Sequence, residues 1–167
     1  ICQAIRQKVG ANYPLFIKLG MIDDVPGGMT AEEGKAIVAT LAEMGLDAIE
    51  ISGGIEGRRS FSIRKGIRST DKEAYFLHLA HQARTVTSLP IILVGGFRSR
   101  QVMEKVIADG DADFIALCRP LICQPDLPQR MRLGLQDRSE CLSANNCWPK
   151  APGEGITCKC PRGLEAR

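Results

Sequence analysis

The sequence is poor in the side chains on which nucleic-acid-binding proteins most depend. Aromatic residues make up only 5% of its 167 residues, and the formal net charge is only +3. So few aromatics leave little surface for stacking bases, and so small a charge gives no extended basic face for a phosphate backbone. We therefore expect no binding of nucleic acid.

A long apolar run is also lacking. No stretch approaches the roughly 18–20 apolar residues that span a bilayer, and the chain does not open on a secretory signal. Cysteine is present but uneven, because Cys141, Cys147, Cys158 and Cys160 crowd the end of the chain while Cys2, Cys118 and Cys123 are scattered. A disulfide framework would be spread more evenly, so we expect a reducing, cytoplasmic location without membrane contact.

Apolar segments that alternate with helical patterns fill most of the chain. Strands are predicted at residues 14–19, 47–54, 90–96 and 112–120. Four βα units in series predict a parallel sheet with right-handed crossovers. Such a sheet is either half of an eight-stranded barrel or a small, open, doubly wound sheet. We expect one domain over residues 1–135 and a cysteine-rich tail over 136–167.

Several local signals mark where the helices begin. Thr30 and Glu33 form a T-x-x-E capping box, Ser99 and Asp126 precede further helices, and residues 71–88 carry a helical apolar stripe. Residues 1–9 are helical in pattern but start without a cap, as expected for a piece of a longer protein.

The carboxyl ends of the strands carry the candidate site residues, because parallel α/β folds bind ligands there. The first strand ends near Lys18, and the second on Gly53 and Gly54. The last two end on sequences that pair backbone N–H groups with an arginine, namely Gly95-Gly96-Phe97-Arg98 and Cys118-Arg119. This combination predicts a phosphate site. Alternatively, paired glycines form only a turn that needs positive φ.

Lys18 and a basic loop each allow two interpretations. A lysine inside an apolar strand needs a partner, because unpaired burial is costly; the partner is either a ligand or the carboxylate of Glu50. The loop at residues 55–70 either attracts a phosphorylated cosubstrate or is simply solvated. Its basic residues are Arg58, Arg59, Arg64, Lys65 and Arg68.

Five segments together resemble a known family. They read PLFIKLG, GGMTAEEG…LAEMGLDAIEISGG, RKGIRSTDKEAYFLHLA, LPIILVGGFRS and ADFIALCRPLICQPDLP. They are similar to the C-terminal half of the old yellow enzyme family of FMN-dependent NADH:flavin oxidoreductases. The resemblance implies a TIM (β/α)8 barrel of which this chain supplies strands five to eight, a (βα)4 half-barrel. It also implies that NAD(P)H reduces FMN, which passes hydride to an activated alkene or similar acceptor.

The resemblance also implies roles for individual residues. Gly95 and Gly96 would cradle the FMN phosphate with Cys118 and Arg119, although the family usually has glycine where Cys118 stands. Lys18 would lie near the flavin N1/O2 edge, where a cation raises the reduction potential. The predicted cofactor-binding set also includes three further residues from the strand ends: Gly53, Gly54 and Arg98.

A branch of this family carries a four-cysteine iron–sulfur pattern in its tail. Cys141, Cys147 and Cys158 fall on three of its places, and Ala144 occupies the second. Cys160 could replace it only if the loop rearranges. Four thiolates bind a [4Fe–4S] cluster, whereas a zinc site or free thiols are the alternatives for this tail.

A half-barrel exposes strand edges and an apolar inner face, so we expect either self-association or an N-terminal segment that closes the barrel. Residues that the family's first four strands contribute to the flavin ring and the substrate cannot be assigned here, and the isolated chain is expected to be inactive. Two other functions stay open. One is a phosphate-binding barrel enzyme that uses Lys18 as a Schiff base, and the other is a truncated, non-catalytic half-barrel.

Overall fold

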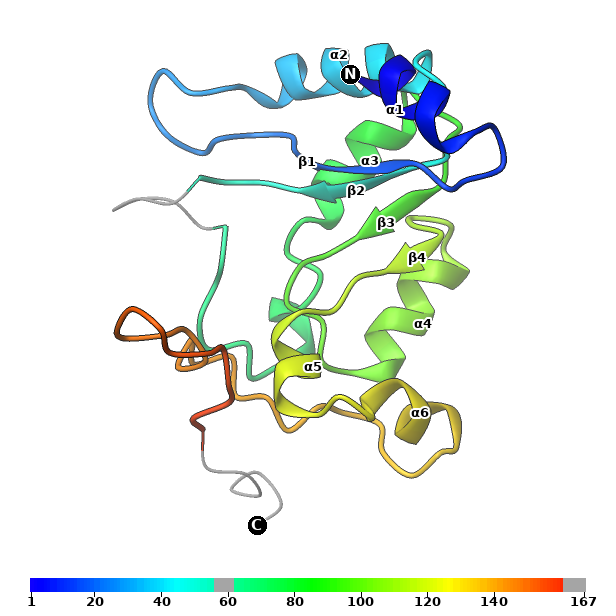
Figure 1. Ribbon diagram of the computed structural model, residues 1–167. Coiled ribbons are helices and arrows are strands. Elements are labelled where there is room, and N and C mark those ends of the chain that lie inside the picture. Colours follow the sequence, from blue (N-terminus) through cyan, green and yellow to red (C-terminus); the bar gives the residue numbers. More distant parts are fainter. Residues whose placement is uncertain (56–61, 161–167) are drawn as a thin grey trace. The chain divides into compact units, whose positions relative to one another are not determined.

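The computed structural model describes residues 1–55 and 62–160, and its sheet has four parallel strands (Figure 1). They are β1 (Phe16–Gly20), β2 (Ala48–Ser52), β3 (Ile91–Leu93) and β4 (Phe114–Ile115). Their order in the sheet is β1-β2-β3-β4, the same as in the chain. A doubly wound sheet reverses its strand order at a switch point, whereas a barrel does not. The fold is therefore α/β, with four sequential βα units of a partial TIM barrel, as predicted.

Helices alternate with these strands along the chain. They are α1 (Cys2–Val9), α2 (Ala31–Ala42), α3 (Leu77–Arg84), α4 (Arg100–Ala108), α5 (Arg119–Cys123) and α6 (Leu127–Arg132), with a 3-10 turn η1 (Thr70–Lys72). The predicted capping box is present, since the Thr30 side chain accepts from the Glu33 N–H and the Glu33 carboxylate accepts from the Thr30 N–H. Gly10 ends α1 with φ +85°, a conformation that suits glycine.

Two predicted elements and one predicted helix cap differ from the structure. The helix expected at 71–88 is divided, because Ala74 has φ +52° and interrupts it between η1 and α3. The strand expected at 112–120 covers only Phe114–Ile115, and Pro120 lies instead in the first turn of α5, where its missing N–H is not needed. Ser99 does precede α4, but its hydroxyl donates to Glu73 instead of capping the helix.

The chain forms two compact units that interleave along the sequence. The first comprises Ile1–Ser62, Phe76–Gly95 and Val106–Ala116, and the second comprises Ile63–Tyr75, Gly96–Lys105 and Leu117–Arg167. The prediction instead divides the chain once along the sequence, into residues 1–135 and 136–167, and it stays a prediction. The sheet belongs to the first unit, and the described part of the cysteine-rich tail belongs to the second.

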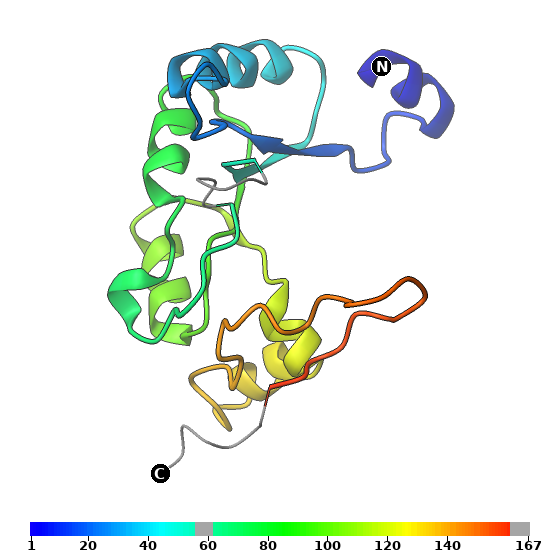
Figure 2. The ribbon, with the colours of Figure 1, turned by 90° about the vertical axis from the view of Figure 1, so that its left-hand side faces the viewer.

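The sheet of the first unit has one buried and one open face. Ile49, Ile51, Ile91 and Leu93 are 0% exposed. Helix α3 packs on β2 and β3, and α2 packs on α3, so both cover the same face (Figure 2). The other face carries Phe16 at 56% and Phe114 at 58% exposure, together with the alternating register partners Lys18 and Glu50. This open face is the one predicted to line a barrel.

In the described ranges, 1–55 and 62–160, no helix is long and apolar enough to cross a membrane.

Candidate functional site

Lys18 lies on the open face of β1 and forms an ion pair with Glu50 of β2. The two are register partners on adjacent strands, so their side chains leave the sheet on the same side. The Lys18 side chain is 56% exposed and that of Glu50 is 18% exposed. Lys18 is thus more than half exposed in the described chain, and of its two predicted partners the Glu50 carboxylate is present. A place for Lys18 at the flavin edge stays a prediction.

Gly53 and Gly54, after β2, are glycines for reasons of packing and turn geometry. A Cβ on Gly53 would lie 2.8 Å from the Leu79 side chain and 2.9 Å from that of Ile22. Gly54 has φ +78°, and its N–H donates to the Ile22 carbonyl at 2.6 Å. These contacts favour the turn interpretation at this strand end, and the predicted cofactor role of the two glycines gains no support from them.

Gly96, after β3, packs directly against an aromatic ring. Its φ is +74°, and a Cβ there would lie 2.6 Å from Cε1 of Tyr75. A side chain is therefore excluded by the Tyr75 ring and by the backbone conformation, not only by the needs of a phosphate. Gly95, the preceding residue, is buried and has φ +155°.

The backbone at Gly96 nevertheless offers donors to a ligand. Among the residues that the structure describes, the N–H groups of Gly96 and Phe97 donate to no oxygen. Successive N–H groups in a turn conformation form a concavity that binds anions, and the chain bends at Gly95 and Gly96. This observation supports the predicted phosphate site at the end of β3.

Arg98 lies inside the second unit and is 0% exposed. Its Nη1 donates to the Ile67 carbonyl at 2.6 Å and its Nη2 to the Ser139 carbonyl at 2.9 Å. The guanidinium therefore holds two chain segments together in the interior of this unit. This geometry favours a structural role over the predicted contact with phosphate.

A buried carboxylate organises the same turn. Glu73 is 5% exposed, and its Oε2 accepts the backbone N–H groups of Arg98 at 2.7 Å and Ser99 at 2.8 Å. Its Oε1 accepts the Ser99 hydroxyl at 2.6 Å. Sequence reasoning missed Glu73, because its partners lie 25 and 26 residues further along the chain.

Arg119, the first residue of α5, is 8% exposed. Its Nη1 donates to the Arg64 carbonyl at 2.8 Å and to Oδ1 of Asn145 at 2.5 Å. In the described part of the chain, Nη2 and Nε make no hydrogen bond, so one edge of the guanidinium is available. The exposed Cys118 precedes it and makes no side-chain cap.

The basic loop joins this arrangement through Arg64. Its guanidinium lies over the Tyr75 ring, 4.7 Å from the centroid, a cation–π contact. Contacts thus run from Gly96 through Tyr75 and Arg64 to Arg119, all within the second unit. Two other basic residues of the predicted loop, Arg58 and Arg59, lie outside the described residues. No local sequence signal identified Tyr75 as a site residue.

The tail thiols are mostly shielded from solvent. Cys141 and Cys147 are buried, and Cys158 and Cys160 are half-buried. Burial raises the pKa of the Cys160 thiol, and the neighbouring thiols of Cys158, Cys141 and Cys147 raise it further, because a second thiolate beside them would be repelled.

These thiols do not form a ready metal site. Within residues 1–55 and 62–160, no three His, Cys, Asp or Glu side chains are arranged to hold a metal ion. The predicted ligands Cys141, Cys147 and Cys158 are thus not shown as a metal site, although their thiols neighbour that of Cys160, and Ala144 supplies no thiol. A [4Fe–4S] cluster stays a prediction from the sequence pattern.

The order of the strands defines the class of fold, a partial TIM barrel, and comparison with known proteins defines the family. The NADH:flavin oxidoreductase / NADH oxidase family model matches residues 1–138. The chain belongs to this family, whose members use FMN and NAD(P)H. The resemblance to the old yellow enzymes is confirmed.

Individual relatives agree with this assignment. The chain is 34% identical to an NADH oxidase of Thermoanaerobacter brockii over 146 residues, which cover 87% of this chain and 22% of that protein. It is 33% identical to an NADH-dependent flavin oxidoreductase of Talaromyces variabilis over 138 residues, 77% of this chain and 33% of that protein. The chain therefore spans about a fifth to a third of the length of these curated relatives.

Solved structures show the same relationship. A 2-naphthoyl-CoA reductase complex matches with a TM-score of 0.70 and 29% identity, over 87% of this chain and 22% of that chain. An old yellow enzyme homologue from Zymomonas mobilis matches with a TM-score of 0.59 and 17% identity, over 83% of this chain and 36% of that chain. The second match shows the fold alone.

Proposed function

We propose that this chain supplies the FMN-phosphate-binding part of an NAD(P)H-dependent flavin oxidoreductase. The observation that carries the proposal is the presence of two sets of hydrogen-bond donors in the second unit. The N–H groups of Gly96 and Phe97 are free among the described residues, and Arg119 offers the Nη2–Nε edge. A phosphate binds well to backbone N–H groups combined with a bidentate arginine.

The residues at this site fit a phosphate in charge as well as in geometry. Arg119 is buried and its orientation is fixed by two acceptors, so it can meet an anion without first becoming ordered. Arg64 adds a second positive charge next to Tyr75. Gly95 and Cys118 adjoin the donors in sequence and complete the proposed set. FMN, when bound, supplies the hydride-transfer chemistry.

Lys18 is proposed to act at the flavin N1/O2 edge. It lies on the face of the sheet that a barrel would enclose, beside Glu50. A cation at that edge stabilises the negative charge of reduced flavin, and the Glu50 carboxylate partly offsets it. The whole reaction, from NAD(P)H to an alkene-like acceptor, also needs residues that the rest of the barrel supplies.

The open face of the sheet supports a further part of the proposal. Phe16 and Phe114 are more than half exposed there, and large apolar side chains on an open sheet favour association. We propose that an N-terminal half-barrel or a second copy of the chain covers this face.

The test of the phosphate site compares FMN with riboflavin, which lacks the phosphate. Titration of the chain, followed by flavin fluorescence, should give saturable FMN binding. Arg119→Ala should weaken FMN binding by about 10- to 100-fold and leave riboflavin unchanged, because it removes a charge-assisted pair of hydrogen bonds. Arg132→Ala, which removes the same charge from an exposed position on α6, is the matched control. The proposal would be contradicted if Arg119→Ala lost affinity equally for FMN and riboflavin, or lost affinity for neither.

A further inference from the structure

Asn145, in the cysteine-bearing segment, contacts the proposed phosphate arginine directly. Its Oδ1 accepts from Arg119 Nη1 at 2.5 Å, and its Nδ2 donates to the Ile63 carbonyl at 3.3 Å. Its backbone has φ +59°, a left-handed conformation that asparagine tolerates better than most residues. One amide thus joins α5 to the residue that precedes Arg64.

These bonds fix one side of the Arg119 guanidinium. Nη1 carries two hydrogens, one of which meets the Asn145 amide oxygen and the other the Arg64 carbonyl. Among the described residues these are the hydrogen bonds that the guanidinium makes, so its direction is set by Asn145 and by the backbone of Arg64. The opposite edge, Nη2 and Nε, then points away from both acceptors.

The segment that carries Asn145 is itself anchored. The Gly66 N–H donates to the Ser143 carbonyl at 3.0 Å, which ties this segment to the same loop that contains Ile63 and Arg64. The backbone two residues before Asn145 is therefore bound to the loop that Asn145 contacts, and such support suits a positioning residue.

The chemistry of the side chain matters at this position. An asparagine is neutral and supplies one acceptor and one donor, as Arg119 and Ile63 require. An aspartate would keep the acceptor but lose the donor. It would also place a negatively charged carboxylate beside the Arg119 guanidinium. That charge would compete with any anion on the opposite edge.

We propose that Asn145 is a positioning residue that holds Arg119 with its Nη2–Nε edge ready for the phosphate of the flavin. The inference rests on the proposed function, and it assigns to the tail segment a role in cofactor binding that needs no metal. It predicts that Asn145 contributes to the affinity for the phosphate and not for the flavin ring.

The experiment measures FMN and riboflavin binding by five variants of the full chain, namely three single variants at Asn145 and Asn146, Arg119→Ala, and the double variant Arg119→Ala/Asn145→Gly. Asn145→Gly removes the amide and keeps the left-handed backbone accessible. Asn145→Asp keeps the shape and adds the competing charge. Asn146→Gly changes the exposed neighbour in the same way and is the matched control. Thermal unfolding of each variant checks that it is folded.

The expected result is a loss specific to FMN. Asn145→Gly should weaken FMN binding by about 3- to 10-fold, because Arg119 must then be ordered on binding. Asn145→Asp should weaken it by about 10-fold or more. Riboflavin binding and the Asn146→Gly control should not change. The double variant Arg119→Ala/Asn145→Gly should bind FMN no more weakly than Arg119→Ala, because the amide acts through the arginine.

Other outcomes separate the inference from the proposed function. If Arg119→Ala loses FMN affinity while both Asn145 variants bind FMN normally, the positioning role is wrong and the phosphate site stands. Equal loss of FMN and riboflavin in the Asn145 variants shows a purely structural role and also overturns the inference. If Arg119→Ala has no FMN-specific effect, or the unaltered chain does not bind FMN, both are overturned. Should Asn145→Gly fail to fold, the nearly isosteric Asn145→Asp decides the question.

Discussion

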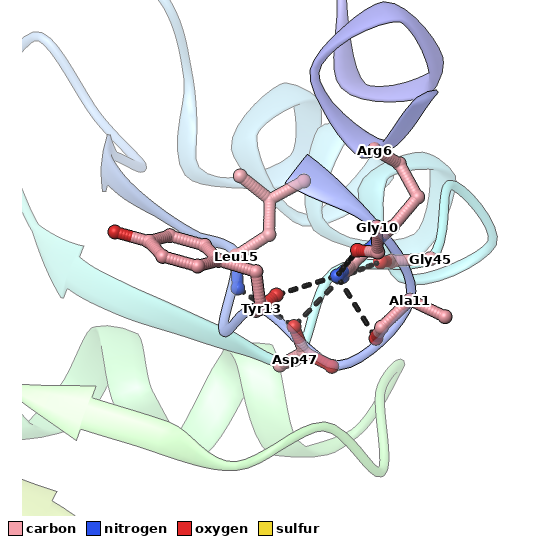
Figure 3. A network of polar contacts seen from close by, with 7 residues as sticks. All are labelled: Arg6, Gly10, Ala11, Tyr13, Leu15, Gly45 and Asp47. Carbon is pink, nitrogen blue, oxygen red and sulfur yellow. Dashed lines mark hydrogen bonds and ion pairs between the residues drawn. The ribbon is translucent and has the colours of Figure 1, made fainter. Parts of the chain in front are cut away.

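The Arg6 guanidinium and the Asp47 carboxylate form an ion pair, with Nη2 and Oδ2 at 2.7 Å, that joins α1 to the start of β2 (Figure 3). Arg6 Nη2 also donates to the Gly45 carbonyl at 2.9 Å, and the Leu15 N–H donates to the same Asp47 oxygen. The Arg6 Nη1 donates to three more carbonyls, those of Gly10, Ala11 and Tyr13. Because none of α1 is buried, these polar contacts are its main described attachment to the first unit.

Removing the arginine should therefore detach α1. We expect Arg6→Ala to lower the thermal midpoint by about 3–6 °C, since several hydrogen bonds are lost together. Lys8→Ala, on the same helix and exposed, is the control and should change the midpoint little. Hydrogen exchange localises the effect: exchange should accelerate in α1. An unchanged midpoint with unchanged exchange would show that the network does not hold the helix.

The same pair makes stability depend on pH. The hydrogen bond from Arg6, together with that from the Leu15 N–H, lowers the pKa of Asp47 below its usual value. A carboxyl whose pKa is lower in the folded state stabilises the fold above its unfolded pKa, and this stabilisation is lost as the pH falls through the folded pKa. Asp47→Asn should therefore reduce the difference in stability between neutral and acid pH. An NMR titration of Asp47 in Arg6→Ala should show the pKa returning upward.

Glu73 should be among the most sensitive positions of the second unit. Glu73→Ala leaves the N–H groups of Arg98 and Ser99 without their acceptor in a buried place, and we expect a loss of about 2–4 kcal/mol in the free energy of unfolding. Glu73→Gln should cost only about 1 kcal/mol. Its amide oxygen can accept both N–H groups while its NH2 donates to the Ser99 hydroxyl.

Urea unfolding measures both variants of Glu73. Glu43→Ala, at an exposed position just after α2, serves as the control. If Glu73→Gln proves as costly as Glu73→Ala, the negative charge itself stabilises the turn, and the hydrogen-bond explanation is wrong.

Gly96→Ala should be destabilising even without a ligand. The new Cβ would lie 2.6 Å from the Tyr75 ring, on a backbone with φ +74°, and we expect a loss of about 2–3 kcal/mol. Gly134→Ala is the matched control, because Gly134 has φ +69° with nothing within 4 Å of the new Cβ. Gly134→Ala should lose only about 1 kcal/mol in the free energy of unfolding, the cost of placing a side chain on a left-handed backbone.

A second substitution separates crowding from conformation at Gly96. In a Tyr75→Ala background, where the ring is gone, Gly96→Ala should cost about as much as Gly134→Ala. Unfolding in urea gives the four free energies of this double-mutant cycle. A cost that does not depend on Tyr75 would show that the ring does not explain the glycine.

The sequence alone predicts the elements that depend on interactions between residues close together in the chain. The capping box at Thr30, the end of α1 at Gly10 and the four parallel strands follow from periodicity and from residues close together in the chain. The role of Arg98 did not, because its acceptors, the carbonyls of Ile67 and Ser139, lie 31 and 41 residues away.

The same limit applies to the candidate site. The strand-end rule located Gly96 and Arg119, since the carboxyl ends of parallel strands can be identified from the order of elements alone. Tyr75 and Asn145 reach those residues only through tertiary contacts. The same rule also selected Gly53 and Arg98, whose described contacts are with the protein itself.

Substitutions at Lys18 and Glu50 can test function without a large change in folding stability. Their ion pair lies on an open face and should contribute less than about 1 kcal/mol to folding, so Lys18→Gln and Glu50→Gln should both remain folded. If Lys18 faces the flavin N1/O2 edge, Lys18→Gln removes a cation from the place where reduced flavin gathers negative charge. The reduction potential of FMN bound to Lys18→Gln should then fall. The potential of FMN bound to Glu50→Gln should rise, because the lysine charge is no longer offset.

The readout for these two variants is the ratio of affinities for reduced and oxidised FMN, since that ratio reports the shift in potential on binding. Lys35→Gln, which breaks a comparable exposed pair with Glu32 on α2, should leave the ratio unchanged. Shifts of opposite sign for Lys18→Gln and Glu50→Gln place both charges at the flavin. Shifts of the same sign, or no shift, would show that the ion pair does not act on the flavin. Only a nearby flavin makes the two opposite charges change the affinity ratio in opposite directions.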